Sequence, residues 1–369
     1  MKTIIVSVTN DLVTDQRVHK VCTTLQEMGF SIHLVGRKLK QSLPLQRSYK
    51  TTRMKLLFTK GPLFYAEYNL RLFMLLLFAK KNVLLANDLD TLFPNFLVSR
   101  LTNKPIVYDS HELFTEVPEL INRPKVQKIW LTIEQFIFPK LKDVFTVNSL
   151  IATIYKDRYS VSVKILRNIA PMFRFSEIDK VFVEKVKGTS KMIILQGAGI
   201  NVDRGGEEAV EMMRYLDNVV LYVIGSGDVF PILKDLVKKY KLENKVFLLG
   251  RRPYDELMQY TKIADLGLSL DKNTNLNYEY SLPNKVFDYI QAETPLLVSN
   301  RRVVAKLVVD ENIGKVIDYH SPKMMADKVQ EMLFSDEYLT WKANLKTAAQ
   351  KYNWEKESKV IKEVYSKFL

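Results

Sequence analysis

The sequence predicts an α/β protein with two doubly wound parallel-sheet domains that face each other across a cleft. Segments typical of buried strands alternate with segments typical of amphipathic helices, which is the pattern of βαβ units. This alternation restarts near residues 163–168, and a loose segment at 169–189 leads into a new first strand. The length of 369 residues is too great for one ordinary α/β core and suits two.

The first half is expected to open with a strand at residues 2–8, a β-branched run that ends in a polar loop. A helix pattern follows at about 17–28, and Gly29 ends it. Further strands are expected at 31–35, 82–86, 105–108 and 143–148.

The second half repeats the scheme. Its expected strands and helices alternate, with strands at 191–195, 219–224, 245–249, 265–269 and 295–299, and helices at 206–216, 229–240, 254–263, 284–292 and 302–310. Two such series joined near residues 165–190 predict two separate sheets.

Composition excludes several classes of protein. With one cysteine, Cys22, no disulfide can form within the chain, which suits a cytoplasmic protein. Four histidines and one cysteine make a structural zinc site unexpected. We do not expect the first residues to form a signal peptide, because their apolar run soon breaks into polar residues. The apolar segment 63–79 contains Glu67 and Arg71, so we expect a buried helix of the first domain rather than a membrane wedge.

The net charge of +14 is concentrated in the first half. Residues 1–180 hold 27 Lys and Arg against 15 Asp and Glu, which gives +12 and leaves +2 for the rest. A basic half indicates a polyanionic partner, and we expect the anionic inner face of the cell membrane. Nucleic acid is the weaker candidate because no recognition motif accompanies the charge, although basicity for solubility alone also fits.

Polar residues follow the strands of the first half, where open parallel sheets bind their ligands. Asp11 follows the first strand, Asp88 a later one, and His111 and Glu112 another. Each residue also has a purely structural interpretation. Arg17, for example, is expected to pair with Asp15 or Asp11 across its loop.

In the second half, glycines follow the strands. Gly199, Gly225 and Gly250 lie in loops where backbone N–H groups could approach phosphates. The loops at 197–199 and 225–227 lack the glycine spacing of known dinucleotide and NTP motifs. Arg204 and Lys285 are candidates to neutralise a diphosphate. The turn Ser281, Leu282, Pro283 and Asn284 opens a helix whose free N–H groups and dipole attract anions.

These segments resemble the retaining GT-B glycosyltransferases of family 4, the glycosyl transferases group 1. The similar stretches include KVFLLGRRPYDEL at 245–257, ADLGLS at 264–269, YDSHELF at 108–114, and the run from Ser281 to Asp288. The resemblance implies two Rossmann-like domains. The first spans residues 1–167 with a returning carboxy-terminal helix at about 350–369, and the second spans 168–349.

The resemblance also implies roles for individual residues. Arg204 and Lys285 would bind the donor diphosphate, and Asp288 would hold the ribose. Gly250, Arg251 and Arg252 lie where the base is held, and Asn284 with 281–283 would line the phosphate and donor sugar. His111 would lie near the transferred sugar and Asp11 near the diphosphate. Apart from the resemblance, Asp88 and Glu112 are candidates for the acceptor side, although Asp88 could instead be a loop hydrogen-bonder and Glu112 could cap a turn.

The chain departs from the family pattern at the first acid of the Glu-x7-Glu motif, where it has Tyr280 beside Glu279. The resemblance otherwise implies transfer from a UDP-, GDP- or ADP-sugar to a glycan or lipid-linked acceptor, without a metal or cofactor. A nucleotide-sugar epimerase of similar fold and a catalytically inactive nucleotide-sugar-binding protein remain the alternatives.

Overall fold

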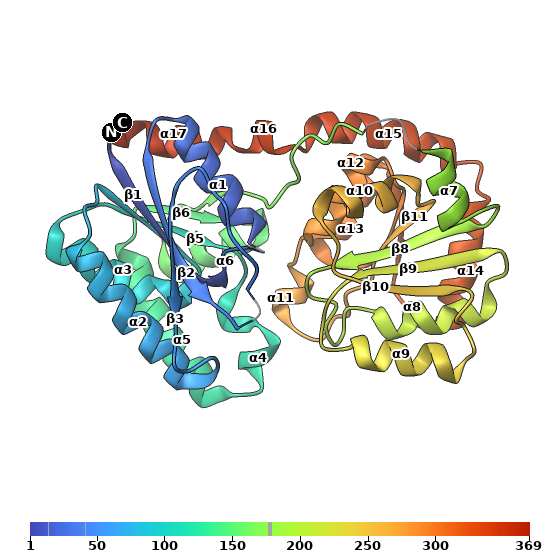
Figure 1. Cartoon of the computed structure of the whole chain (residues 1–369), viewed down its shortest axis with the longest axis horizontal. Coiled ribbons are helices and arrows are strands. Elements are labelled where there is room, and N and C mark those ends of the chain that lie inside the picture. Colours follow the sequence, from blue (N-terminus) through green and yellow to red (C-terminus); the bar gives the residue numbers. More distant parts are fainter. Residues whose placement is uncertain (14, 41, 176–178) are drawn as a thin grey trace. The chain divides into compact units, whose positions relative to one another are not determined.

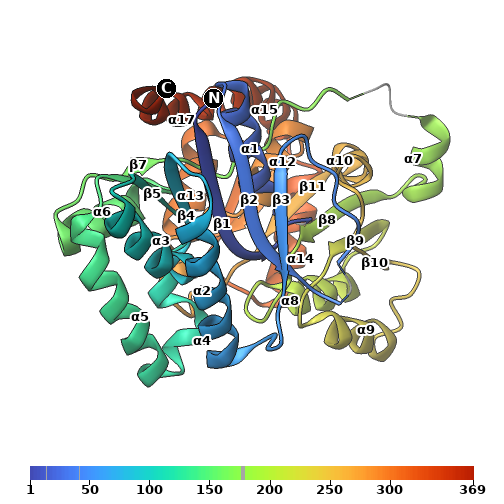
Figure 2. The same ribbon diagram turned by 60° about the vertical axis from the view of Figure 1, so that its left-hand side comes forward.

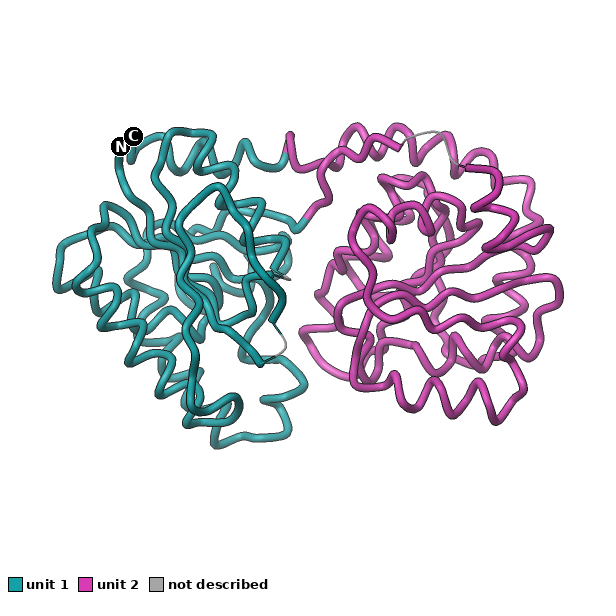
Figure 3. Tube along the Cα trace, in the orientation of Figure 1, with its two compact units in different colours: residues 1–168, 357–369 teal, residues 169–356 magenta. Residues whose placement is uncertain are grey.

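The computed structural model describes residues 1–13, 15–40, 42–175 and 179–369, and it divides into two compact units. Unit 1 comprises residues 1–168 and 357–369, and unit 2 comprises residues 169–356 (Figure 3). Each unit is an α/β domain with an all-parallel sheet, so the predicted fold class of two parallel-sheet domains is confirmed.

Unit 1 has a seven-stranded sheet in the order β3-β2-β1-β4-β5-β6-β7. Its strands are β1 (Thr3–Asp11), β2 (Ser31–Lys38), β3 (Lys50–Lys55), β4 (Val83–Asn87), β5 (Ile106–Ser110), β6 (Asp143–Thr146) and β7 (Lys164–Ile165). Its helices are α1 (Gln16–Glu27), α2 (Gly61–Phe78), α3 (Leu89–Thr102), α4 (Pro118–Ile121), α5 (Pro124–Ile137), α6 (Ser149–Tyr159) and α17 (Lys359–Tyr365). Helices α2, α3 and α5 lie along one face of this sheet, and α1 and α17 lie along the other (Figures 1 and 2).

Unit 2 has a six-stranded sheet in the order β10-β9-β8-β11-β12-β13. Its strands are β8 (Lys191–Gly197), β9 (Val219–Gly225), β10 (Val246–Gly250), β11 (Leu266–Ser269), β12 (Leu296–Ser299) and β13 (Gly314–Ile317). Its helices are α7 (Lys180–Val186), α8 (Gly206–Met212), α9 (Phe230–Lys239), α10 (Tyr254–Ile263), α11 (Leu276–Glu279), α12 (Asn284–Ala292), α13 (Arg302–Glu311), α14 (Pro322–Leu333), α15 (Tyr338–Lys351) and α16 (Trp354–Glu357). Separate apolar cores lie on the two faces of the sheet, one under α8, α9 and α14 and the other under α10, α12, α13 and α15.

In both sheets the strand order reverses direction beside the first strand. This topological switch point lies between β1 and β4 in unit 1 and between β8 and β11 in unit 2. Ligands of open parallel sheets bind outside the carboxyl ends of the strands at such points. The topology therefore identifies one edge of each sheet as the place to look for a site.

The carboxy-terminal stretch from about residue 350 is not the single helix that we predicted. Asn353 ends α15 because its side-chain amide donates to the carbonyls of Ala349 and Gln350 at 3.1 and 2.9 Å. The same side chain accepts from the backbone N–H of Lys356 at 3.0 Å and so starts α16. Glu357, where the chain enters unit 1, accepts a hydrogen bond from the backbone N–H of Arg167 at 2.7 Å.

Helix α2 is only partly the buried helix that we predicted for residues 63–79. It belongs to unit 1, as expected, and buries Phe64, Tyr68, Leu72 and Leu76. Its other face is exposed, because Leu63, Leu70, Met74 and Phe78 are between 46% and 77% accessible. Among the described residues, no helix is both long enough and apolar enough to span a bilayer.

Candidate functional site

The carboxyl edge of the unit 1 sheet brings together polar residues from two neighbouring strands. Asn87 ends β4, Asp109 lies near the end of β5, and His111 follows β5 directly. Strands β4 and β5 pair in parallel, with Asn87 opposite Asp109. The neighbouring strand ends thus place these side chains beside the switch point.

Arg17 and Asp109 form a buried ion pair beneath this edge. The guanidinium binds the carboxylate through two nitrogens, with Nε 3.0 Å from Oδ2 and Nη2 2.6 Å from Oδ1. The side chains are only 3% and 1% exposed. The predicted pairing of Arg17 with Asp15 or Asp11 was wrong, because α1 turns Arg17 toward the sheet and leaves Asp15 as the helix cap.

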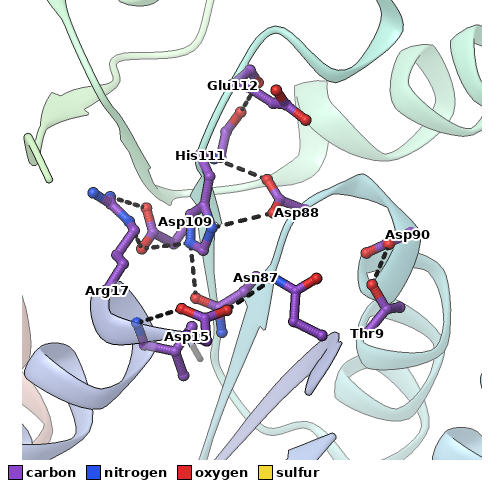
Figure 4. A network of polar contacts seen from close by, with 12 residues as sticks. Thr9, Asp15, Arg17, Asn87, Asp88, Asp90, Asp109, His111 and Glu112 are labelled. Atoms are coloured by element: carbon purple, nitrogen blue, oxygen red, sulfur yellow. Dashed lines mark hydrogen bonds and ion pairs between the residues drawn. The ribbon is translucent and has the colours of Figure 1, made fainter. Parts of the chain in front are cut away.

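His111 lies between two carboxylates (Figure 4). Its Nδ1 is 3.1 Å from Oδ2 of Asp88, and its Nε2 is 3.3 Å from Oδ2 of Asp109 and 3.2 Å from Oδ1 of Asn87. Burial favours the neutral ring, but the charges of Asp88 and Asp109 outweigh it and raise the pKa of His111 to about 10. The imidazole is therefore a cation at neutral pH and serves as a donor rather than a base.

Asp109 is the negatively charged partner of both Arg17 and His111. Burial alone would raise its pKa, yet Arg17 and His111 hold that pKa well below its usual range. Arg17, Asp109 and His111 therefore form a fixed chain of alternating charges.

Asp88 is held in a strained backbone conformation, with φ of 59° and ψ of 165°. Residues other than glycine rarely adopt this region, and doing so costs about 1–3 kcal/mol. The conformation lets one Asp88 carboxylate oxygen accept the backbone N–H of His111 at 2.9 Å while the other faces the ring. Strain of this kind concentrates at functional sites.

Two other predicted residues of unit 1 lie apart from the His111 ring. Asp11 binds Arg53 at 3.1 Å and accepts from the Ser42 hydroxyl at 2.5 Å. Glu112 follows His111, and its carboxylate points away from the imidazole (Figure 4). The structure therefore groups His111 with Asp88 but not with Asp11 or Glu112.

In unit 2, the loops after β8 and β9 cross at very short range. The backbone N–H of Ile200 donates to the carbonyl of Ser226 at 2.8 Å. A Cβ on Gly225 would lie 1.8 Å from the carbonyl oxygen of Gly197, and one on Gly227 would lie equally close to that of Ile200. Glycine is required at both positions by this backbone contact, whereas a Cβ on Gly199 would meet only ordinary contacts.

Arg204 and Lys285 converge on Asp271, which follows β11. Arg204 Nη1 is 3.3 Å from Asp271 Oδ1, and its guanidinium lies 4.5 Å from the centre of the Tyr278 ring. Burial and the charge of Arg204 lower the pKa of Lys285, while Asp271 opposes them. Within the part of the chain that the structure describes, Lys285 Nζ makes no hydrogen bond or ion pair. A buried ammonium without a partner is a strong site for an anion.

Helix α12 begins at this cation pair. Pro283 precedes it, no side chain caps it, and Asn284 at its start is exposed. Ser281 and Leu282 are half-buried in the preceding turn, where the Ser281 hydroxyl donates to the carbonyl of Tyr278 at 3.0 Å. The uncapped N–H groups add to the positive potential beside Lys285.

Asp288 lies one helical turn further along α12. Its carboxylate accepts from the Tyr254 hydroxyl at 2.9 Å and from the Gln196 amide at 3.1 Å. These two contacts fix the direction of the carboxylate. The carboxylate therefore has a fixed position one helical turn beyond the start of α12.

The base-binding candidates follow β10. Gly250 ends this strand with φ of 68°, and nothing lies near its missing side chain. Arg251 donates to the Ser226 hydroxyl at 2.7 Å, and Arg252 is 3.2 Å from Glu256. The two arginine side chains thus contact the protein itself.

Sequence reasoning missed Asp271, Tyr278, Tyr254 and the Arg17–Asp109 pair. Asp271 was detectable, because it follows a strand as the predicted residues do. The others depend on tertiary contacts between distant segments, which no local pattern reports.

Comparison with known proteins agrees with this architecture. Residues 178–352 match the family described as glycosyl transferases group 1. Sucrose-phosphate synthase from Thermosynechococcus elongatus superimposes with a TM-score of 0.79 at 15% identity, covering 100% of this chain and 99% of that one. HepE from Anabaena, in complex with UDP and glucose, gives 0.75 at 14% identity over 99% of this chain and 100% of that one.

WaaG, a glycosyltransferase involved in lipopolysaccharide biosynthesis, gives a TM-score of 0.68 at 14% identity, covering 97% of this chain and 99% of that one. At such identities these likenesses show the fold alone. No curated protein sequence matches the chain. The match to the glycosyl transferases group 1 family thus lies almost wholly within the second unit, and the fold of the whole chain is that of the GT-B glycosyltransferases.

Proposed function

We propose that this protein transfers a sugar from a UDP-sugar to an acceptor, with retention of configuration. The observation that carries the proposal is the ammonium of Lys285, which is buried at the start of α12 beside Arg204 and makes no hydrogen bond or ion pair with any residue that the structure describes. These groups suit a diphosphate, and Asp288 one turn on suits a ribose. Binding of UDP by HepE, a protein of the same fold, supports the choice of base.

In this mechanism the acceptor hydroxyl attacks the anomeric carbon on the face that the diphosphate leaves. The bond from the acceptor oxygen to that carbon forms as the bond to the phosphate oxygen breaks, and a phosphate oxygen takes the hydroxyl proton. Arg204, Lys285 and the N-terminus of α12 stabilise the charge on the leaving diphosphate without a metal or cofactor. His111 is not placed to remove a proton, because it is a cation and both of its ring nitrogens face oxygen atoms of the protein.

The test of this proposal is the turnover of Lys285→Ala. We expect kcat/KM for release of UDP from the donor to fall about 10²-fold, the usual loss when one charge-stabilising group is removed. The matched control is Lys245→Ala, because Lys245 lies at the opposite edge of the same sheet and binds Asp217. Near-normal turnover in Lys285→Ala would refute the assignment.

Thermal-shift screening against UDP-, GDP- and ADP-sugars tests the donor. Stabilisation by UDP-sugars alone supports the proposal. Conversion of a labelled UDP-sugar to its epimer without any acceptor would favour a nucleotide-sugar epimerase instead. No response to any nucleotide would favour a protein without this activity.

We further propose that the acceptor is a lipid-linked glycan of surface-polysaccharide synthesis, reached from the cytoplasmic side of an anionic membrane. Large apolar side chains are exposed on three neighbouring helices of unit 1. They are Leu63, Leu70, Met74 and Phe78 on α2, Leu101 on α3, and Ile129 and Phe136 on α5. The role of WaaG in lipopolysaccharide biosynthesis supports an acceptor of this class.

The charges on the same helices favour an anionic surface. Their four basic residues, Arg71, Arg100, Lys125 and Lys128, are all exposed. The acidic residues of these helices are not exposed. Asp90 and Glu134 are buried, and the Glu67 carboxylate accepts hydrogen bonds from the backbone N–H groups of Leu57 and Phe58. An apolar surface bordered by basic side chains is typical of proteins that bind the membrane interface.

Co-sedimentation with vesicles tests the membrane proposal. We expect wild-type protein to bind vesicles rich in anionic lipid at low salt and to release from them at high salt. Leu70→Ser combined with Phe78→Ser should weaken this binding, whereas Val309→Ser, an exposed apolar residue of unit 2, should not. Equal binding to neutral vesicles, or none to anionic ones, would contradict it.

A further inference from the structure

Two arginines share one carboxylate at the carboxyl edge of the unit 2 sheet. Arg301 and Arg302 follow β12, and Glu279 is the last residue of α11. Arg301 Nη1 is 2.6 Å from Glu279 Oε2, and Arg302 Nε is 3.3 Å from Glu279 Oε1. One negative charge therefore faces two positive charges.

The surplus positive charge is available to a ligand. The Arg302 side chain is 65% exposed, and its guanidinium lies 5.6 Å from the centre of the Tyr280 ring. Arg301 is 8% exposed, and its buried Nε has no hydrogen-bond partner among the residues that the structure describes. Helix α13 starts at Arg302 without a side-chain cap, so its dipole and free N–H groups add to this positive potential.

The order of groups in a nucleotide sugar places this cluster beside the sugar. In the proposed function, Asp288 holds the ribose, and the start of α12 with Lys285 holds the diphosphate. The sugar lies on the side of the diphosphate away from the ribose, and hence beyond the start of α12. The residues that precede α12 are Tyr280 to Pro283, and Tyr280 stands against Arg302.

We propose that the transferred sugar is acidic, a hexuronic acid whose carboxylate is bound by Arg302. A guanidinium matches a carboxylate with two parallel hydrogen bonds, which gives both strength and direction. Tyr280 agrees with this choice, because it is neutral where the related enzymes have an acid that would repel a second carboxylate. Glu279 does not repel it, since Arg301 and Arg302 neutralise its charge.

Calorimetric titration of the full chain tests the proposal, which rests on the proposed function. The probes are UDP, UDP-glucose and UDP-glucuronate, and the two sugars differ only in a hydroxymethyl or a carboxylate at C6. We expect wild-type protein to bind UDP-glucuronate at least about tenfold more tightly than UDP-glucose. Arg302→Gln should abolish that preference and leave the affinity for UDP unchanged.

The matched control is Lys306→Gln, one turn along the same helix, where Lys306 is exposed and pairs with Asp310. It should keep the preference, which separates a specific contact from general attraction of the extra charge. The acidic-sugar inference would be overturned if wild-type protein bound UDP-glucose as tightly as UDP-glucuronate or more tightly, or if the preference for UDP-glucuronate survived Arg302→Gln. Neither outcome would affect the proposed function. No binding of UDP itself would overturn the proposed function as well.

Discussion

At the scale of single residues, the buried pair of Arg17 and Asp109 anchors His111. A buried charge that loses its partner is costly, typically by about 3–5 kcal/mol. We therefore expect Arg17→Met to lower the free energy of unfolding by roughly that amount in urea denaturation. Arg158→Met, which removes a more exposed partner of Glu116 in the same unit, should have a much smaller effect. Equal effects of the two substitutions would show that the Arg17–Asp109 pair is not anchoring this edge.

The protonation of His111 predicts how stability depends on pH. The charges of Asp88 and Asp109 overcome the effect of burial and raise its pKa to about 10, whereas an unfolded histidine titrates near 6.5. The resulting stabilisation is complete below about pH 6.5 and is lost as the pH rises toward 10. Urea denaturation at pH 6 to 9 should show unfolding free energy falling by up to about 1.4 kcal/mol per pH unit.

In His111→Gln this component of the pH dependence should be absent. A wild-type stability that stays constant or increases across the same range would mean that the imidazole is neutral in the folded protein.

The sequence predicted some of these residues and not others for a physical reason. Strand ends bring Asp88 and His111 to one edge in any parallel sheet, so their proximity could be predicted. Arg17 could pair with any nearby acid, and only the packing of α1 selects Asp109, 92 residues away. The contact of Tyr254 with Asp288 likewise depends on how α10 packs beside α12.

At the scale of elements, the crossing glycine loops of unit 2 separate structural from functional glycines. Gly227→Ala should destabilise the protein by more than about 2 kcal/mol, because its Cβ would meet the backbone of Ile200. Gly199→Ala has room for its Cβ in the protein and should change the melting temperature little. Because Gly199 lies at the proposed phosphate site, that variant should nevertheless bind UDP more weakly. Calorimetric melting and UDP titration of both variants check this, and a Gly199→Ala variant with unchanged affinity would remove Gly199 from the site.

The strands that the sequence did not predict lie at the sheet edges. Strand β3 (KTTRMK) and strand β13 (GKVI) are the outer strands of their sheets and are only partly buried. An edge strand needs few apolar residues, so it lacks the hydrophobic pattern that revealed the central strands. Helix α2 misled for the opposite reason, since its apolar residues cover an exposed face as well as a buried one.

At the scale of the whole molecule, each unit has its own apolar core and its own polar edge. The alternation of strands and helices predicted this division, because each sheet needs a complete series of βαβ units. The proposed activity divides in the same way, with the nucleotide sugar assigned to unit 2 and the membrane surface to unit 1.

The central claim is that the carboxyl edge of the unit 2 sheet binds the nucleotide diphosphate. Hydrogen exchange of backbone amides in the full chain, with and without UDP, tests it most directly. We predict slower exchange in the loops at 197–200 and 225–227 and in the first turn of α12 when UDP is present. Unchanged exchange in all three segments at saturating UDP, with protection elsewhere in the chain, would contradict the account.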